Sequence, residues 1–196
     1  MPRGPANPTA VRDRLLTAAR ELFYAQGVHA VGVNEIAARA GASKLSLYRY
    51  FPAKDDLVAA MLAEHSDRIH AWLVRNTADA PAGADRVLSV FDLLIEWFAQ
   101  PGYRGCAVVN TVTDTRAEPR VAEIARRHLL RYRELLETRV REAGGREPRA
   151  LARQLLLLIE GASVVTAIDG DAQAGRAARR AARDLLSAHR TEPAAR

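Results

Sequence analysis

The chain has 196 residues, and its content of 48% hydrophobic and 27% charged residues is ordinary for a soluble globular protein. This length allows one sizeable core, or a small domain beside a larger one. The net charge of +6 and the pI near 10.1 suit a nucleic-acid partner. However, residues 1–60 hold 8 basic and 5 acidic side chains, and the rest holds 21 and 18. Because the excess is spread evenly, charge alone is weak support for such a partner, and it argues against a protein that compacts DNA without specificity.

Cysteine usage and hydropathy indicate a cytoplasmic protein. The single Cys106 excludes an intrachain disulfide and fits a reducing compartment. The first ten residues contain three prolines and no apolar segment, so we expect no secretory signal. The most apolar stretch, residues 155–168, is short and carries Glu160, so we expect it not to span a membrane.

Two helices are predicted in the first 40 residues. Residues 8–26 carry an apolar stripe at helical spacing, and Gly27 ends it. Residues 34–40 repeat the spacing of a helix with one buried face. Gly41 then provides a chain reversal, because glycine adopts left-handed backbone angles without a Cβ clash.

A third short helix follows directly after this reversal. Ser43 is suited to cap a helix that begins at Lys44, and Leu47 and Phe51 would be its buried residues. Pro52 ends the helix, since proline disfavours helical angles at the preceding residue. Two short helices joined by a glycine turn predict a helix-turn-helix, whose second helix enters the major groove of DNA.

The remainder of the chain is predicted to be helical as well. Pro, Gly and Asp residues separate segments with helical spacing, and we find no strand-like alternation and no repeats. The predicted helices after Pro52 are 54–76, 104–115, 119–143, 148–168 and 172–189, together with a helix that Asp85 caps and that Pro101-Gly102 breaks. The fold class is therefore all-α, with about nine helices.

The segment around the glycine turn resembles the TetR family of bacterial transcriptional regulators. The resemblance covers about residues 10–60. It implies a helix-turn-helix DNA-binding domain over residues 10–53, followed by a larger helical effector-binding and dimerisation domain over residues 54–190. We expect residues 1–9 to be a disordered arm and residues 191–196 a tail. The residues that match the family pattern are Phe23, Gly27, Val33, Ile36, Ala37, Ala40, Gly41, Ser43, Lys44, Leu47, Tyr48, Phe51, Lys54 and Leu57.

Three positions depart from the family pattern. Gly32 replaces the usual hydroxyl-bearing cap of the second helix. Leu45 stands where a small residue is frequent, which affects base preference. Ala53 lacks a capping oxygen, so we expect Asp55 and Asp56 to favour the start of the next helix through the helix dipole alone.

The first turn of the third helix is expected to contact base edges. There Lys44 can donate to guanine, and Leu45 can touch a thymine methyl. The resemblance implies phosphate contacts for Tyr48, Tyr50 and Lys54, although Tyr48 could instead pack in the small domain and Lys54 could be merely solvated. The expected DNA-binding residues are Lys44, Leu45, Ser46, Tyr48, Arg49, Tyr50 and Lys54.

The last two helices are suited to a homodimer. Residues 155–159 are apolar all round, so every face must be covered. The resemblance implies a four-helix interface between two subunits, which would let a dimer bind a palindromic operator in double-stranded DNA. The alternative is that these helices complete the core of one subunit. The expected interface residues are Leu155, Leu158, Gly161, Ala162, Ala178, Ala181 and Leu185.

The resemblance also implies a small-molecule effector among the middle helices. Large aromatic residues with a few polar groups are typical of such a site, although each aromatic could equally be plain core. Cys106 is expected to be a packed residue, because an activated thiolate requires a cationic neighbour. The expected ligand-binding residues are Trp72, Phe91, Trp97, Phe98, Asn110, Thr113, His128, Tyr132 and Ser163.

The sequence thus predicts a repressor that binds its operator as a homodimer and that an effector releases. An activator, or a regulator without a ligand, is the alternative. Because the chain contains no G-x-S-x-G, H-E-x-x-H, P-loop or dinucleotide fingerprint, we expect no enzyme activity, no cofactor and no metal.

Overall fold

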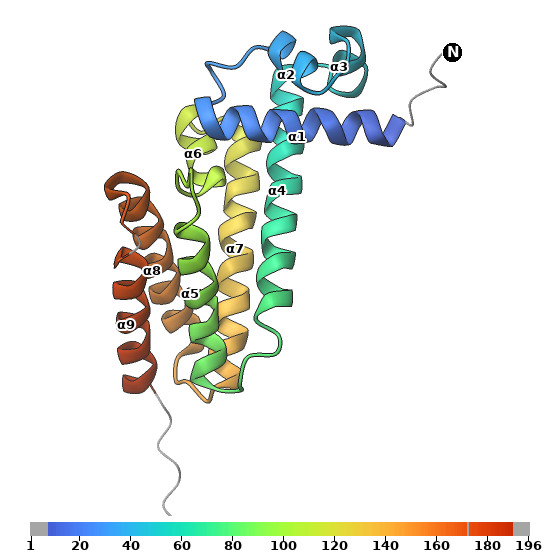
Figure 1. The fold of residues 1–196 in the computed structure, drawn as a ribbon. Helices are drawn as coiled ribbons and strands as arrows, with labels where there is room; N and C mark the ends of the chain where they lie inside the picture. Colours follow the sequence, from blue (N-terminus) through green and yellow to red (C-terminus); the bar gives the residue numbers. More distant parts are fainter. Residues whose placement is uncertain (1–7, 172, 190–196) are drawn as a thin grey trace, which may run out of the picture. The chain divides into compact units, whose positions relative to one another are not determined.

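The computed structural model describes residues 8–171 and 173–189, and its regular elements in these ranges are α-helices (Figure 1). The all-α prediction is therefore confirmed. The helices are α1 (Pro8–Gln26), α2 (Val33–Arg39), α3 (Lys44–Tyr50), α4 (Lys54–Asn76), α5 (Ala84–Phe98), α6 (Ala107–Asp114), α7 (Pro119–Glu142), α8 (Pro148–Asp169) and α9 (Gln173–Ala188).

Helix ends agree with the sequence prediction to within one or two residues at nearly every boundary. The largest difference is at α6, which begins at Ala107 instead of Arg104. The reason is Gly105, whose φ of 91° is left-handed and interrupts the helical path. Of the expected disordered arm, residues 1–7 lie outside the described residues, as does the expected tail at 191–196.

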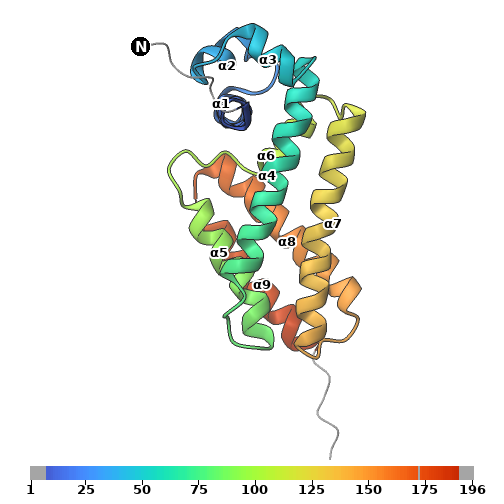
Figure 2. The same ribbon diagram turned by 90° about the vertical axis from the view of Figure 1, so that its right-hand side faces the viewer.

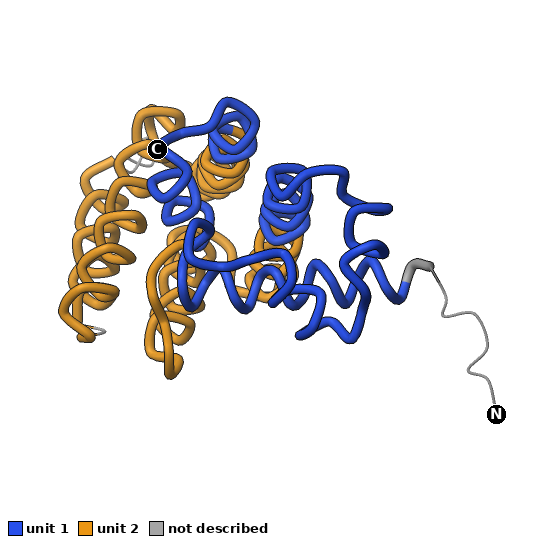
Figure 3. Tube along the Cα trace, turned by 90° about the horizontal axis from the view of Figure 1, so that it is seen from above, with its two compact units in different colours: residues 1–67, 107–126 blue, residues 68–106, 127–196 orange. Residues whose placement is uncertain are grey.

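The chain divides into two compact units (Figure 3). Unit 1 contains the described residues up to Asp67 together with Ala107–Arg126, and unit 2 contains Arg68–Cys106 and the described residues from Arg127 onward. Two of the three divisions fall inside long helices, α4 and α7, and the third falls at the start of α6. The boundary expected at residue 53 marks the end of the helix-turn-helix, which is only part of unit 1, and as a domain boundary it stays a prediction.

Unit 1 is built around α1. Helices α2 and α3 pack against it, and α2 packs against α3 (Figure 2). Leu15 and Leu16 of α1, Ile36 of α2 and Leu47 of α3 are almost fully buried where these helices meet. The apolar spacing read from the sequence therefore corresponds to one small core.

Unit 2 has a larger core in which α8 and α9 lie side by side and both contact α5 (Figures 1 and 2). Leu136, Leu151 and Leu155 are fully buried there. A buried arginine fixes the end of α4: Arg139 donates to the Thr77 carbonyl oxygen at 3.1 Å and to the Thr77 hydroxyl at 2.8 Å. The first of these bonds satisfies a carbonyl at the helix end, and the Thr77 hydroxyl also donates to the Leu73 carbonyl at 2.7 Å.

Helix α8 contains the most apolar stretch of the chain. The helix has 22 residues, and by length and composition alone it could cross a membrane, with a mean hydropathy of 1.6 in its most apolar part. The helix is longer than the apolar stretch because it begins at Pro148, before the apolar run. Core helices of soluble proteins pass the same test, and the inner face of α8, from Leu151 to Thr166, is buried in unit 2.

Candidate functional site

The turn between α2 and α3 is a compact helix C-cap. Gly41 has a φ of +59°, in the left-handed region. Its N–H donates to the Ala38 carbonyl at 3.1 Å, and the Ala42 N–H donates to the Ala37 carbonyl at 2.9 Å. This pair of bonds is the Schellman motif, which reverses the chain within two residues. The turn therefore sets the direction in which α3 leaves α2.

Ser43 begins α3 as predicted. Its backbone is extended, with φ −84° and ψ 155°, and its Oγ accepts from the Ser46 N–H at 3.0 Å. The hydroxyl of Ser46 lies 2.9 Å from the same Oγ. Ser46, expected at base edges, is thus half-buried and engaged in the cap of its own helix.

The outward face of α3 carries most of the expected DNA-binding residues. Leu47 anchors the helix and is 0% exposed, whereas its neighbour Leu45 is 81% exposed. Lys44 and Arg49 are exposed, and the Lys44 ammonium lies 5.9 Å from the centre of the Tyr48 ring. Tyr48 is 39% exposed, so its ring is not packed in the small core. Tyr50 is half-buried, with its ring 6.5 Å from that of Phe51.

The start of α4 is held by two charged side chains. Lys54 donates from Nζ to the Val28 carbonyl oxygen at 2.5 Å and lies 5.8 Å from the centre of the Phe23 ring. It is therefore not merely solvated. The Asp56 carboxylate accepts from the Ala53 N–H at 3.0 Å. The expectation that this helix start relies on the dipole alone was wrong, because Asp56 reaches back to cap it.

Asp56 also makes an ion pair with the first turn of α7. Arg120 Nη1 lies 2.6 Å from Asp56 Oδ1. The hydrogen bond from Arg120 lowers the pKa of Asp56, and the same bond raises the pKa of Arg120. Both side chains reach solvent, so this pair is screened by salt and contributes little to stability.

Asp114, at the end of α6, makes two polar contacts that the sequence did not predict. Its carboxylate accepts from the Val28 N–H and, at 3.3 Å, from the His29 N–H. Both belong to the turn after α1. The partners are 85 and 86 residues apart in the chain, so no spacing pattern could have paired them.

This geometry defines the class of protein. A helix-turn-helix whose second helix is anchored by one buried leucine and presents exposed polar residues is a DNA-binding fold. The sequence profile of "Bacterial regulatory proteins, tetR family" matches residues 15–61, which hold the helix-turn-helix and most of α1.

Relatives extend the match to the rest of the fold. A putative TetR transcriptional regulator from Streptomyces avermitilis is 30% identical, with a TM-score of 0.82 over 94% of this chain and 98% of that one. A TetR-family transcriptional regulator from Streptomyces coelicolor is 28% identical, with a TM-score of 0.85 over 93% and 97%. The transcriptional activator FasR from Mycolicibacterium smegmatis is 39% identical over 114 residues, which are 57% of this chain and only half of that relative's length. The chain belongs to the TetR family of DNA-binding transcriptional regulators.

Several of the expected effector-binding residues meet in unit 2. The ring centres of Trp72 and Trp97 are 6.1 Å apart, and those of Trp97 and Tyr103 are 5.8 Å apart. The ring centres of Phe98 and Tyr103 are 5.0 Å apart. Phe91 is also buried in this core. Tyr103, which the predicted set omitted, is the ring that joins the aromatic cluster to polar groups.

Buried and partly buried polar side chains lie next to these rings. The hydroxyls of Tyr103 and Ser163 are 2.7 Å apart. The Cys106 sulfur lies 3.9 Å from His128 Nε2, and the ring centres of His128 and Tyr132 are 5.1 Å apart. We refer to Tyr103, Cys106, His128, Tyr132, Glu160 and Ser163 as the interior polar cluster.

Burial favours the neutral forms of His128, Tyr132 and Glu160 in the interior polar cluster. Desolvation, followed by the charges of Arg131 and His70, lowers the pKa of His128 to about 4. Desolvation also raises the pKa of Glu160 and, together with Cys106 and Glu160, that of Tyr132. A neutral His128 supplies no positive charge to the Cys106 thiol, so this contact does not activate it.

Two members of the predicted effector set lie elsewhere. Asn110 and Thr113 are on α6, in unit 1, and both side chains are exposed. The Thr113 hydroxyl donates to the Val109 carbonyl within the same helix, at 3.1 Å. The reason for the difference is that α6 is a short helix whose buried face is formed by Ala107, Val108 and Thr111.

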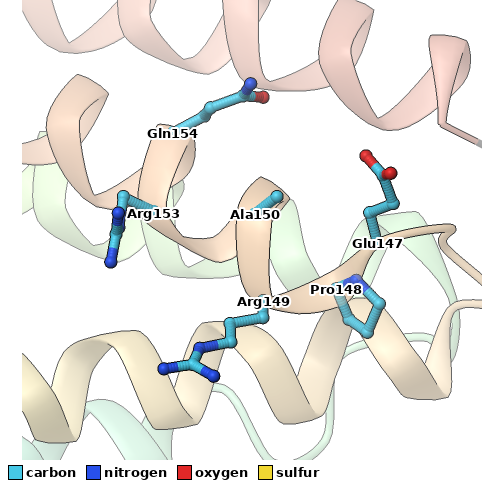
Figure 4. Close-up of a pocket in the computed structure, with 6 residues that line it drawn as sticks. All are labelled: Glu147, Pro148, Arg149, Ala150, Arg153 and Gln154. Carbon is cyan, nitrogen blue, oxygen red and sulfur yellow. The ribbon is translucent and has the colours of Figure 1, made fainter.

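A hollow on the surface of unit 2 does not coincide with these residues. It has a volume of about 590 Å³, and it lies at the start of α8 beside Glu147, Arg149 and Arg153 (Figure 4). All its lining side chains come from one short segment, and none is in the predicted effector set. Among the described residues, no group of three or more His, Cys, Asp or Glu side chains could hold a metal ion.

The outer face of α8 is apolar and uncovered within the subunit. Its large exposed residues are Leu157, Val164, Val165 and Ile168, of which Ile168 is 77% exposed. Of the residues expected at a dimer interface, Leu155, Ala162 and Ala178 are buried inside unit 2. Leu158, Gly161, Ala181 and Leu185 retain accessible surface.

Proposed function

We propose that this protein binds a palindromic operator through α3 and regulates transcription from it as a homodimer. The observation that carries this proposal is the outward face of α3, where Lys44, Leu45 and Arg49 stand exposed above the buried Leu47. A leucine left 81% exposed gains nothing in the free subunit, but it suits contact with a thymine methyl. Lys44 donates to guanine, and Tyr48, Tyr50 and Lys54 contact phosphates.

A protection assay on the DNA that flanks the gene tests this function. We expect a protected palindrome whose half-sites are separated by about 34–36 Å, one turn of the duplex. Lys44→Ala should weaken binding and relax the preference at one base pair. Lys54→Ala should weaken binding to every sequence and reduce the salt dependence by about one phosphate. Protection that is lost at physiological salt would contradict a specific operator.

The homodimer in this proposal forms through the outer faces of α8 and α9. A contiguous apolar face is costly in water and marks an interaction surface. Near its middle is Gly161, where an added Cβ would meet no atom within 4 Å in the free subunit. The subunit therefore does not require this glycine, whereas close approach of a partner helix would.

Sedimentation of interface variants tests the dimer. Ile168→Arg and Gly161→Leu should each shift the protein toward the monomer, because they place a charge or a large side chain at the seam. The matched control is Leu130→Arg, an exposed apolar position on α7 that is outside this face. A dimer unaffected by both α8 variants would contradict the assignment.

The effector in this proposal is a small molecule that binds in unit 2 at the aromatic and polar residues around Tyr103. A mostly apolar site with a few polar groups is typical of small-molecule binding. A DNA titration with candidate effectors measures the coupling, which is typically about 5–150-fold in affinity. If no candidate changes DNA affinity, the ligand-free alternative is favoured.

We propose repression as the direction of regulation and the cytoplasm as the location. The relative from M. smegmatis is named an activator, so the direction needs its own test. Transcription from the operator-bearing promoter should rise when the gene is deleted, and a fall would identify an activator. The relatives are transcriptional regulators, which are not enzymes, and we propose no catalytic activity.

A further inference from the structure

We propose that Asp114 is a positioning residue for DNA binding, and that it acts on Lys54 through the backbone of Val28. This inference rests on the proposed phosphate contact of Lys54. Asp114 belongs to α6 and lies outside the matched helix-turn-helix.

Val28 is bonded at both ends of its backbone. Its N–H donates to the Asp114 carboxylate, and its carbonyl oxygen accepts from Lys54 Nζ at 2.5 Å. The same carboxylate accepts from the next N–H, that of His29, at 3.3 Å. A bond to an ionised carboxylate is roughly twice as strong as a neutral one. The carboxylate therefore fixes the turn that carries the acceptor of Lys54.

Gly27 allows the carboxylate to come this close. Its φ is +87°, and a Cβ placed there would lie 3.2 Å from Asp114 Oδ2. Any other residue would be strained in its backbone and would push against the carboxylate. The glycine that ends α1 thus also makes room for Asp114.

The side of α6 that offers the carboxylate is itself well fixed. After Asp114, the N–H groups of Arg116 and Ala117 donate back to Thr113 and Val112 at 3.2 and 2.8 Å. Arg116 and Ala117 both have positive φ, 52° and 56°. These two bonds cap the end of α6, so Asp114 projects from a defined backbone.

A lysine benefits from such support. A free lysine side chain loses rotamer freedom when it is immobilised, and a preorganised one has already lost part of it. The ammonium has three donors, and one of them bonds Val28, so two can bind phosphate oxygens. The relay Asp114–Val28–Lys54 therefore holds the ammonium in place before DNA arrives.

The relay and the net charge predict opposite effects of removing Asp114 on the affinity for DNA. Removing a carboxylate from a DNA-binding unit should strengthen binding by electrostatics alone. The relay instead predicts that Asp114→Ala weakens binding about tenfold, by loss of one well-placed charge-assisted hydrogen bond. Asp13→Ala, an exposed acidic position on α1, serves as the control that measures the charge effect by itself.

A double-mutant cycle tests the inference. Affinity for the operator is measured by fluorescence anisotropy over a range of salt for wild type, Asp114→Ala, Lys54→Ala and the double variant. We expect Asp114→Ala to reduce the salt dependence by about one phosphate and to have no further effect when Lys54 is absent. Asp114→Asn, which keeps an acceptor oxygen but loses the charge, should bind between wild type and Asp114→Ala. Amide exchange at Val28 and His29, measured on folded protein, should speed up in Asp114→Ala and stay slow in Lys54→Ala.

The other possible results of this experiment distinguish a failure of the relay from a failure of the proposed function. Additive effects of the two alanine variants, or tighter binding by Asp114→Ala, would overturn the relay and leave the proposed function intact. If Lys54→Ala binds as wild type does, the relay fails together with the Lys54 contact, while a defect in Lys44→Ala would still support operator binding. If wild type protects no DNA, the proposed function itself fails.

Discussion

The outward face of α3 and the interior polar cluster use similar side chains in opposite surroundings. Tyr48 on α3 is 39% exposed, whereas Tyr132 in unit 2 is 4% exposed and burial raises its pKa. On α3 the side chains of Lys44, Tyr48 and Arg49 are exposed to water, and a single buried leucine holds the helix. In unit 2 the polar atoms are desolvated, and burial favours their neutral forms. The first region therefore leaves its charges accessible, whereas the second shields its polar atoms from water.

The largest expected effect is the difference in stability between alanine variants of Leu47 and Leu45, which lie on the same helix. Leu47→Ala leaves a cavity in a fully buried position and should cost about 2–5 kcal/mol of unfolding free energy. Leu45→Ala should change it by less than about 0.5 kcal/mol, because the side chain is exposed, yet it should weaken operator binding. Urea unfolding and operator titration of both variants measure this. If the two variants lose equal stability, α3 is not anchored as described.

The next largest expected effect is a loss of folding stability at acidic pH, which His128 causes. Its folded pKa is about 4 and its ordinary value is 6.5, so the folded state favours the neutral ring. The stability that depends on this neutral form is complete above pH 6.5 and is lost as pH falls toward 4. The expected loss is about 3 kcal/mol by linkage.

Urea unfolding from pH 7 to pH 4 measures this loss. His128→Gln should flatten the profile, and His29→Gln, at an exposed turn, should not. The charged groups that lower the pKa, Arg131 and His70, should be kept in both variants. An unchanged profile in His128→Gln would assign the acid sensitivity to other groups.

The third prediction concerns Ser43, which caps the start of α3. Ser43→Ala removes the bond to the Ser46 N–H and should cost about 1 kcal/mol of stability. It should also weaken operator binding, because the first turn of α3 carries Lys44 and Leu45. Thermal unfolding and anisotropy check both effects. Ser43→Gly should cost less stability, since glycine is tolerated at this position.

The smallest expected effect comes from Glu160, whose contribution to folding stability changes with pH in the opposite direction to that of His128. Burial raises its pKa, so its contribution to stability is present below the ordinary value of 4.5 and is lost as pH rises through the raised value. Glu160→Gln should therefore be slightly more stable than wild type at pH 7. The gain should disappear at acidic pH in the same unfolding series. A variant that is less stable at pH 7 would reveal an unrecognised partner of the carboxylate.

Local signals were sufficient for most of the fold. The position of Gly41, the cap at Ser43 and the stop at Pro52 each act within a few residues, and the structure has all three where they were expected. Helix spacing also placed Leu47 and Ile36 in the core. Such features depend on short-range geometry, which a single sequence contains.

Contacts between distant segments could not be predicted in this way. Asp114 meets Val28, and Arg139 caps α4 at Thr77, across 86 and 62 residues. Asn110 and Thr113 looked like interior polar residues because their helix is otherwise apolar, but they face outward. Which side of a short helix is buried depends on its neighbours, and periodicity over eight residues does not identify them.

The uncovered face of α8 has a consequence for handling the protein. If a second subunit covers Leu157 and Ile168, dilution exposes both side chains to water, and the folded state becomes less stable as the protein is diluted. Melting temperatures recorded at different protein concentrations would then not be comparable. Operator affinities measured at very low protein concentration would likewise include the work of bringing two chains together.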